Sequence, residues 1–390
     1  MNLKYLYTKT ILLLALSIIL FGCSKQQSLQ EILGENRIII PNTTDTTYVE
    51  INPAWQGFNN PTAILAGNDG FLYVADTDNN KVVQMTESGV ILETRGIINP
   101  IALAQDLRLD LLVSGLIYST VINDSIPAIF RIHLYESDHH LAVARIDTVY
   151  KEPTRPNRRF TGIAMMKDNN YLVTRRGPDN SSFIDPDTRL LRFMAQTRKD
   201  TTKDGDGNVI SIKDTIIDKS LGPVSDLATR QGQGLTDILQ PTGIATFPNS
   251  NDFILTQSSA GGTMIYGALW MVYYNVPTFE GWLPKFDVRK PEERNRDFIK
   301  PNRFVEAASA TVDGSRLDIF VIDTEQDSLV KFDRRGNYKP ESFGKSYLAT
   351  LGSPSLNHPK GVAYKVGAKT LYITDSGNNK IRRFRLSTDR

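Results

Sequence analysis

Residues 70–83 read GFLYVADTDNNKVV and residues 370–381 read TLYITDSGNNKI, two similar segments near opposite ends of a chain of 390 residues. Each is preceded by an apolar segment that begins at a proline, PTAILA from Pro61 and PKGVAY from Pro359. The pattern predicts a strand, a turn, a second strand ending in Asp, an Asn-rich turn and a third strand. A unit of this kind that recurs along a chain indicates a radial or solenoid array of repeats.

Four weaker copies lie between these two segments. Residues 99–104 read NPIALA, residues 160–164 read FTGIA, residues 241–245 read PTGIA, and residues 319–324 read IFVIDT. Six units therefore begin near residues 61, 100, 161, 241, 304 and 359. Their average spacing of about 60 residues exceeds the roughly 40–50 residues of compact propeller blades, so we expect long loops between the strands.

These residues resemble the NHL repeat, whose pattern is close to Pro-x-Gly-Ile-Ala followed by Leu-Tyr-Val-Ala-Asp-Thr-Gly-Asn-Asn-Arg-Ile. The first and last copies match it closely, and the middle four have lost the Asp or the Asn-Asn turn. The resemblance implies an all-β fold of the NHL/TolB-like type, a six-bladed β-propeller with four antiparallel strands in each blade.

The two ends of the repeat region predict how the ring closes. The first unit has four strand-like segments, 62–66, 71–75, 81–86 and 90–94, whereas the last has three and ends at Ile381–Leu386. Thr46–Ile51 alternates polar and apolar residues and would supply the missing fourth strand. Closure of this kind leaves no open sheet edge on which the chain could aggregate.

The first 22 residues are typical of a secretory signal peptide. Lys4 and Lys9 precede the apolar run Ile11–Phe21, which is too short to span a bilayer as a helix. The run leads into Leu-Phe-Gly-Cys at residues 20–23, which resembles the bacterial lipobox. The resemblance implies cleavage before Cys23 and attachment of lipid to its sulfur.

We therefore expect three parts: a lipoprotein signal peptide over 1–22, a lipid anchor and tether over 23–45, and the propeller over 46–390. Ser24 follows the cysteine where an Asp would suggest retention in the inner membrane. By resemblance to lipoprotein sorting, the sequence predicts a lipid anchor in an outer membrane, with the protein facing the periplasm or the cell surface.

Composition and the absence of known motifs argue against several classes of function. The formal net charge of +2 gives no basic stripe of the kind that nucleic-acid binding requires, and the single cysteine excludes an internal disulfide. Motifs for a serine hydrolase, a zinc protease, a phosphate loop or a dinucleotide site are absent from the sequence. The sequence therefore predicts no catalytic residue, no metal ligand and no cofactor.

Strand direction predicts the binding face. The start of each first strand and the end of each second strand lie on one side of the ring, because the two strands are antiparallel. The longest predicted connections lie there too, at 115–127, 177–188, 220–240, 257–268 and 285–303. Because loops on a rigid scaffold usually carry function, we expect a ligand to bind on this face.

Candidate binding residues follow from this geometry. The second strands end in a possible polar ring of Asp76, Arg175, Gln257, Asp323 and Asp375. The alternative is that each Asp accepts hydrogen bonds from backbone N–H groups in its own turn.

The third repeat is basic. Arg155, Arg158 and Arg159 precede its first strand, and Arg175 and Arg176 end its second. Arginine forks suit carboxylates and phosphates, so an anionic ligand is conceivable. The alternative is solvated arginines paired with Asp179, Asp185 or Asp187.

Two further segments draw attention. Seven aromatic residues lie within 261–286, including Trp270, and form either core packing or a surface that contacts sugars or proteins. Residues 204–208, DGDGN, resemble the start of a calcium loop but lack its Gly and Glu, so they predict a hairpin turn.

Two functions follow as hypotheses. The first is a non-enzymatic, lipid-anchored propeller of the cell envelope that binds a protein or a glycan through its loop face. The alternative is a metal-dependent propeller hydrolase or lyase that acts on a lactone, a peptide or a sugar, with Asp76, Asp323 and Asp375 near the channel.

Overall fold

The computed structural model describes residues 46–182, 184–224, 238–258, 266–287, 290–294, 296–344 and 355–389. Cys23 lies outside the described residues, as do the middle parts of two predicted loops, 225–237 and 259–265. Thr46–Arg390 is one compact unit, and the description below concerns this unit alone.

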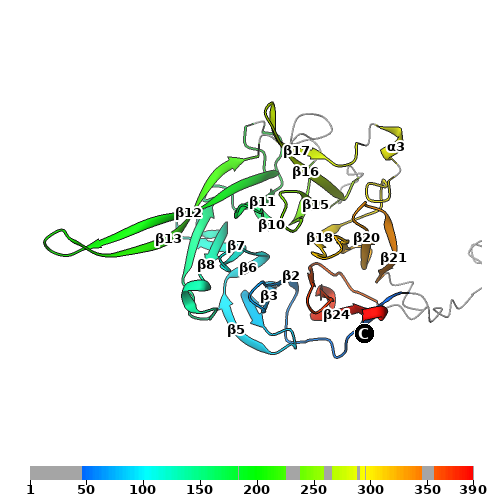
Figure 1. Ribbon diagram of the computed structural model, residues 1–390, viewed down its shortest axis with the longest axis horizontal. Helices are drawn as coiled ribbons and strands as arrows, with labels where there is room; N and C mark the ends of the chain where they lie inside the picture. Colours follow the sequence, from blue (N-terminus) through cyan, green and yellow to red (C-terminus); the bar gives the residue numbers. More distant parts are fainter. Residues whose placement is uncertain are drawn as a thin grey trace, which may run out of the picture. The chain divides into compact units, whose positions relative to one another are not determined.

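The described residues form six antiparallel sheets of four strands, arranged as the blades of a propeller (Figure 1). The first blade consists of β2 (Pro61–Ala66), β3 (Leu72–Asp76), β4 (Lys81–Met85) and β5 (Ile91–Gly96). The second consists of β6 (Ile98–Gln105), β7 (Leu111–Ser119), β8 (Asp124–Ile132) and β9 (Ile146–Lys151). The third consists of β10 (Arg159–Met165), β11 (Asn170–Arg176), β12 (Arg189–Lys203) and β13 (Val209–Pro223).

The other three blades follow in chain order. They are β14 (Pro241–Thr246), β15 (Phe253–Gln257), β16 (Ala268–Val276) and β17 (Phe279–Pro284); β18 (Ala307–Val312), β19 (Ile319–Asp323), β20 (Ser328–Phe332) and β21 (Tyr338–Phe343); and β22 (Val362–Lys365), β23 (Thr370–Asp375) and β24 (Lys380–Leu386) with β1 (Tyr48–Glu50). The predicted fold class and the predicted starts of all six units are confirmed.

Among the described residues, helical structure is confined to short segments outside the strands. Four 3₁₀ helices are η1 (Thr77–Asn79), η2 (Tyr135–Ser137), η3 (Ser376–Asn378) and η4 (Ser387–Asp389), and one helical turn is α3 (Pro291–Arg294). Among the described residues, no helix has the length and apolar character needed to cross a membrane.

The hydrophobic core consists of six clusters, each lying between neighbouring blades. One cluster joins Val74 of the first blade to Tyr372 of the last, and the next joins Tyr73 to Val113 of the second blade. Both faces of β3 are therefore covered, and all five of its residues are buried. This two-sided burial explains why the second strands read as continuous apolar runs rather than as alternating patterns.

The ring closes as the sequence predicts. β1 pairs antiparallel with β24, with Tyr48 opposite Leu386 and Glu50 opposite Phe384. The Tyr48 ring packs edge-on against Phe320 of the fifth blade, with ring centroids 6.0 Å apart. The first strand of the unit therefore completes the last blade and also contacts the blade before it.

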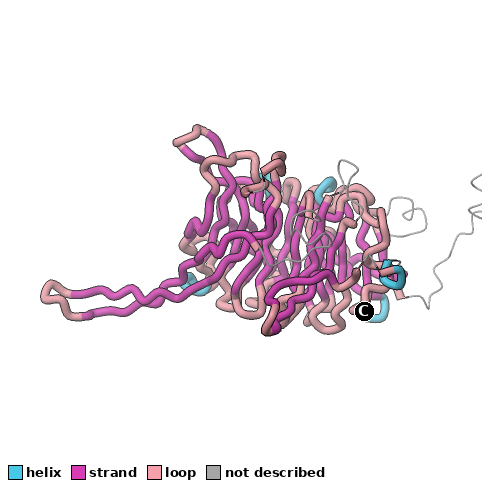
Figure 2. The backbone as a smooth tube through the Cα atoms, turned by 90° about the horizontal axis from the view of Figure 1, so that it is seen from above, coloured by secondary structure: helices cyan, strands magenta, loops and turns pink. Residues whose placement is uncertain are grey.

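The third blade departs from the expected size. β12 and β13 each contain 15 residues and extend as a two-stranded arm away from the ring (Figures 1 and 2). At the tip, the Asp204 carboxylate accepts hydrogen bonds from the N–H groups of Asp206 and Asn208, so residues 204–208 form the predicted hairpin turn.

The predicted loops 115–127 and 220–240 are wrong in part. Residues 115–127 belong mostly to the paired strands β7 and β8, with a short turn at 120–123, and β13 continues to Pro223. Residues 115–127 are rich in β-branched residues, which favour a strand even where the hairpin extends beyond the rest of the blade.

Candidate functional site

The repeated Asp and Asn residues hold neighbouring segments together. The buried Asp76 carboxylate accepts hydrogen bonds from the Asn59 N–H at 2.7 Å and from the Asn79 side chain at 2.8 Å. Asn80 then adopts a left-handed conformation, φ 52°, which Asn tolerates better than most residues. Its side-chain oxygen accepts a hydrogen bond from the N–H of Asn99, in the next blade.

The last blade repeats this arrangement. Asp375 accepts hydrogen bonds from the Asn357 N–H at 2.7 Å and from Asn378, and Asn379 accepts one from the N–H of Asn60 in the first blade. The motif that reveals the repeat therefore connects consecutive blades.

The other members of the predicted polar ring are also buried and hydrogen-bonded. Asp323 accepts hydrogen bonds from three backbone N–H groups, including that of Val305 at 2.7 Å, and burial raises its pKa. The Gln257 side chain accepts a hydrogen bond from the Leu239 N–H and donates one to the Tyr266 carbonyl. The contacts of the aspartates and of Gln257 are those of the structural alternative, in which strand-end side chains satisfy backbone groups.

Hydroxyl groups join five of the six blade junctions. Each donates a hydrogen bond to a carbonyl at the start of the first strand in the next blade: Thr77 to Pro100, Thr161 to Pro241, Thr242 to Ala307, Thr324 to Pro359 and Ser376 to Pro61. Three of these residues, Thr77, Thr324 and Ser376, directly follow the repeated Asp, whereas Thr161 and Thr242 lie in first strands. The sequence did not reveal this structural role.

The basic residues of the third blade divide into two pairs. Arg158 and Arg175 are buried, and both pair with the carboxylates of Glu152 and Asp185. Arg158 also pairs with the Asp187 carboxylate, and Arg175 donates a hydrogen bond to the Asp187 carbonyl. Asp185 and Asp187 were predicted partners, but these arginines are buried rather than solvated, and Glu152 was not foreseen. Buried charges must be paired and hydrogen-bonded, so these two arginines serve the fold.

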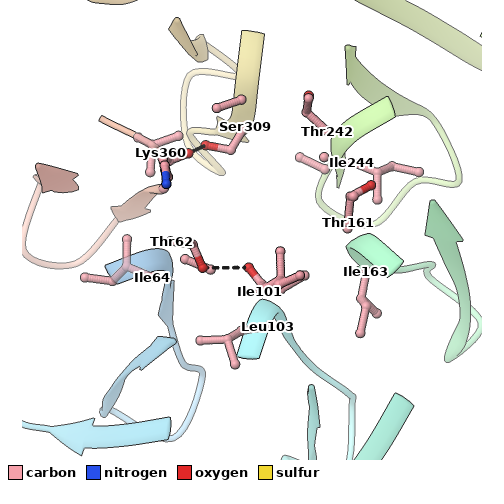
Figure 3. Close-up of a pocket in the computed structure, with 18 of the residues that line it drawn as sticks. Thr62, Ile64, Ile101, Leu103, Thr161, Ile163, Thr242, Ile244, Ser309 and Lys360 are labelled. Atoms are coloured by element: carbon pink, nitrogen blue, oxygen red, sulfur yellow. Dashed lines mark hydrogen bonds between the residues drawn. The ribbon is translucent and has the colours of Figure 1, made fainter. Parts of the chain in front are cut away.

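Arg159 and Arg176, the second pair, line a cavity of about 560 Å³ at the centre of the ring. The walls of this cavity come from the first strands of all six blades (Figure 3). Close packing of these strands needs small residues: a Cβ added at Gly361 would lie 2.8 Å from the Cα of Ala63. Four of these strands also bulge, at Thr62, Thr161, Thr242 and Ala308.

Five ionisable side chains line the end of the cavity where the first strands start and the second strands end. We call them the mouth residues: Asp78, Arg159, Arg176, Glu306 and Lys360. All are at least partly exposed. The side chains of Asp78, Arg176 and Glu306 form no hydrogen bond or ion pair with another described residue.

The two other mouth residues bond only to neutral groups among the described residues. Arg159 donates to the carbonyls of Pro156 and Arg158, and the Lys360 ammonium donates to the Asn60 side chain at 2.8 Å. Burial lowers the pKa of both groups, and the negative charges of Asp78 and Glu306 partly offset this effect at Lys360.

Trp270 lies in the core between the fourth and fifth blades, away from the mouth residues. Its ring stacks on Phe247 with centroids 4.8 Å apart, and the Lys285 ammonium lies over its face. Trp282 of the same aromatic segment is fully buried. For these two residues, the contacts are those of core packing.

Sequence reasoning missed Asp78, Glu306 and Lys360. A usable signal is the alignment of the repeats themselves: Lys360 occupies the position of Thr62, Thr161 and Thr242, and Glu306 that of Asn60 and Asn99. A charged residue where other repeats carry a neutral one marks a position that the fold itself does not require.

Over residues 46–389, apart from the gaps given above, no three His, Cys, Asp or Glu side chains lie where they could together hold a metal ion.

Fold and cavity together define a six-bladed β-propeller with a charged mouth to its central channel. No protein-family model matches the chain, and no curated protein matches it. Solved structures do match the chain, and among them are six-bladed propellers of the gluconolactonase type.

Three of these structures illustrate the match. A gluconolactonase from Xanthomonas campestris is 11% identical, with a TM-score of 0.51 over 88% of this chain and 91% of that one. An auxiliary nutrient binding protein from Bacteroides thetaiotaomicron is 12% identical, with a TM-score of 0.54 over 88% and 76%. A PQQ-bound aldose sugar dehydrogenase from Streptomyces coelicolor is 12% identical, with a TM-score of 0.53 over 88% and 99%. At such low identity the likeness shows the fold alone.

Proposed function

We propose that the protein is a non-enzymatic binding propeller of a bacterial cell envelope, anchored by lipid at Cys23, which binds a glycan or a protein at its channel mouth. The observation that carries this proposal is the set of five mouth residues. They are charged, gathered in one concavity, and bonded to no oppositely charged described residue within 4 Å.

Charged side chains of this kind are suited to an external ligand. A fold that needed them for stability would pair them, as it pairs Arg158 and Arg175. Concave sites with a few convergent polar groups are the usual form of ligand sites, and this cavity lies within the range of about 300–1,000 Å³ that small-ligand sites occupy. One structural neighbour is an auxiliary nutrient binding protein, which is compatible with this role.

The enzymatic alternative has less support. Its proposed carboxylates, Asp76, Asp323 and Asp375, are buried and each accept a hydrogen bond from a backbone N–H group of the preceding loop. A carboxylate used in this way is poorly placed to leave its donors for a metal or a substrate.

Crosslinking and recovery from the native envelope test the binding function. The full chain is compared with a variant that carries Arg159→Gln, Arg176→Gln and Lys360→Gln together, and with Arg155→Gln, which changes an exposed arginine outside the cavity. We expect a specific glycan or protein to be recovered with the wild type and with Arg155→Gln but not with the triple variant. Equal recovery with the triple variant would contradict the proposal.

The same samples test the rival function. The protein would be an enzyme rather than a binding module if the wild type hydrolysed or eliminated a lactone, peptide or sugar and contained a stoichiometric divalent ion. The triple variant would then have to lose this reaction.

The lipid anchor is tested separately. Cys23→Ala should leave the full-length, unlipidated precursor, because no other cysteine can take the lipid. Metabolic labelling with a fatty acid followed by mass spectrometry measures this, and acylated mature protein from the variant would refute the anchor.

A further inference from the structure

The mouth residues are distributed unevenly around the channel. Arg159 and Arg176 both belong to the third blade, where they lie directly opposite each other on the paired strands β10 and β11. Lys360 belongs to the sixth blade, and Asp78 and Glu306 to the first and fifth blades beside it. In a ring of six, the third and sixth blades face each other across the channel. One side of the mouth therefore carries two positive charges, and the other carries one positive and two negative charges.

The arginine pair is not explained by the fold. Like charges directly opposite each other on neighbouring strands destabilise a sheet. Neither guanidinium is within ion-pairing distance of a carboxylate among the described residues, although Arg158 and Arg175 next to them in sequence are fully paired. An anion held between Arg159 and Arg176 would remove this repulsion.

The opposite side suits hydroxyl groups. Asp78 and Glu306 accept hydrogen bonds, Lys360 donates them, and Asn60 does both, so a ligand there must both donate and accept. Sugar hydroxyls do this. A ligand ammonium group would be attracted by the carboxylates of Asp78 and Glu306 and repelled by the ammonium of Lys360, which Figure 3 shows at the cavity, so a zwitterion is the competing ligand class.

We propose that the channel mouth binds a saccharide that carries a carboxylate, with the carboxylate on Arg159 and Arg176 and the ring hydroxyls on Asp78, Glu306 and Lys360. This inference rests on the proposed binding function and names its ligand class. The planar guanidinium groups match a carboxylate through paired, charge-assisted hydrogen bonds. Below the mouth, apolar residues such as Ile64, Leu103 and Ile244 form part of the cavity wall, which confines most of the charge to the entrance (Figure 3).

Calorimetric titration of the full chain in detergent tests the inference. The probes are trimers of galacturonate, glucuronate and mannuronate, their methyl esters, and a zwitterionic tripeptide of similar size. The ester keeps every hydroxyl but removes the charge. We expect at least one uronate trimer to bind, its ester to bind at least 10-fold more weakly, and Arg176→Gln to weaken binding of the trimer at least 10-fold.

A matched control and a second readout separate binding from folding. Arg155→Gln should bind the trimer as the wild type does. In the absence of ligand, Arg176→Gln should melt at the same temperature as the wild type or higher, because it relieves the repulsion with Arg159. A lower melting temperature would show that the arginine pair stabilises the fold, and would overturn the inference.

The remaining outcomes separate the ligand class from the function. Equal binding of ester and acid, tighter binding of the tripeptide, or no binding of any uronate would refute the carboxylated saccharide. If recovery of an envelope ligand still depends on the mouth residues, the proposed function survives that result. If recovery of the envelope ligand is unchanged in the triple variant, both the carboxylated saccharide and the proposed binding function are refuted.

Discussion

Asp76 and Asp375 show how one residue type can suggest a site and yet serve the backbone. Each carboxylate lies at the end of a second strand on the predicted binding face, but each is fully buried and accepts the N–H of a residue in the preceding loop. Arg175 and Arg176 show the same division between adjacent residues. The first is buried in an ion-pair network, and the side chain of the second lines the channel with no hydrogen bond or ion pair to another described residue.

Replacing Arg175 by methionine should destabilise the protein strongly. The substitution keeps much of the side-chain volume but leaves the carboxylates of Glu152 and Asp185 with Arg158 alone, and it removes the donor to the Asp187 carbonyl. Removing one partner of a buried ionic network typically costs about 3–5 kcal/mol. Denaturant unfolding measures this, with the exposed Arg155→Met as a control that should change stability by less than about 0.5 kcal/mol. A loss for Arg175→Met no larger than that of the control would show that the network is solvated.

The buried Tyr372 side chain should make the folded protein less stable at alkaline pH. Burial raises the pKa of this tyrosine to about 12, above the value of about 10 for an unfolded chain. Its contribution is fully present below about pH 10 and is lost as the pH rises towards 12, at about 1.4 kcal/mol per pH unit while only the unfolded chain ionises. Tyr372→Phe should lose less stability than the wild type between pH 9 and pH 11.5.

Chemical unfolding at a series of pH values measures that difference. Tyr135→Phe, at a ring that is 72% exposed, is the control and should follow the wild type. Parallel pH profiles for Tyr372→Phe and wild type would contradict the assignment.

At the scale of elements, most strands are covered on both sides, and the arm is the exception. β11 pairs with β12 only up to Met194, whereas β12 and β13 remain paired out to Lys203. Ile210 and Ile212 near the tip are 63% and 62% exposed. The outer part of the arm therefore buries little apolar surface and should contribute little to stability.

Shortening the arm tests this. Replacing Lys199–Asp214 by Asn-Gly joins Arg198 to Thr215, which are already opposite each other, and keeps the hydrogen bond between Arg108 and Thr197. The melting temperature should stay within about 2 °C of the wild type, because the propeller blades lose no contact. A large drop would show that the arm packs against the ring.

At the scale of the whole molecule, the ring is held by contacts that pass from blade to blade. Six apolar clusters, the hydroxyl-to-carbonyl bonds and the Asn contacts all cross junctions. The last blade also depends on β1, whose Glu50 carboxylate accepts hydrogen bonds from Nε and Nη2 of Arg382 at 2.8 and 2.6 Å.

Weakening β1 should destabilise the entire ring. Tyr48→Ala removes a buried ring that packs against Phe320 and Phe343, and such a truncation typically costs about 3–5 kcal/mol. Deletion of Thr46–Ile51 should lower the melting temperature further, because it also frees the edge of β24. Thermal unfolding measures both, and the exposed Thr47→Ala serves as the control. Unchanged melting of the deletion variant would mean that the ring does not need its closing strand.

The sequence by itself determined the fold, because the information for a blade is local. The proline start, the Leu-Tyr-x-x-Asp run and the Asn-Asn turn each act within a few residues, and they recur after Pro61 and Pro359. With the four weaker copies between them, they predict the number of blades, and the missing fourth strand of the last unit predicts the closure by β1. The hairpin turn at residues 204–208 was predictable for the same reason.

Only the tertiary structure decided which of the polar residues are free to bind. Arg158 and Arg159 are adjacent and chemically identical, and so are Arg175 and Arg176, yet alternate side chains of a strand point in opposite directions. One of each pair reaches Glu152, while the other reaches the channel. The mouth itself unites Asp78, Arg159 and Lys360 from three blades far apart in sequence, and no local pattern records that proximity because ring closure creates it.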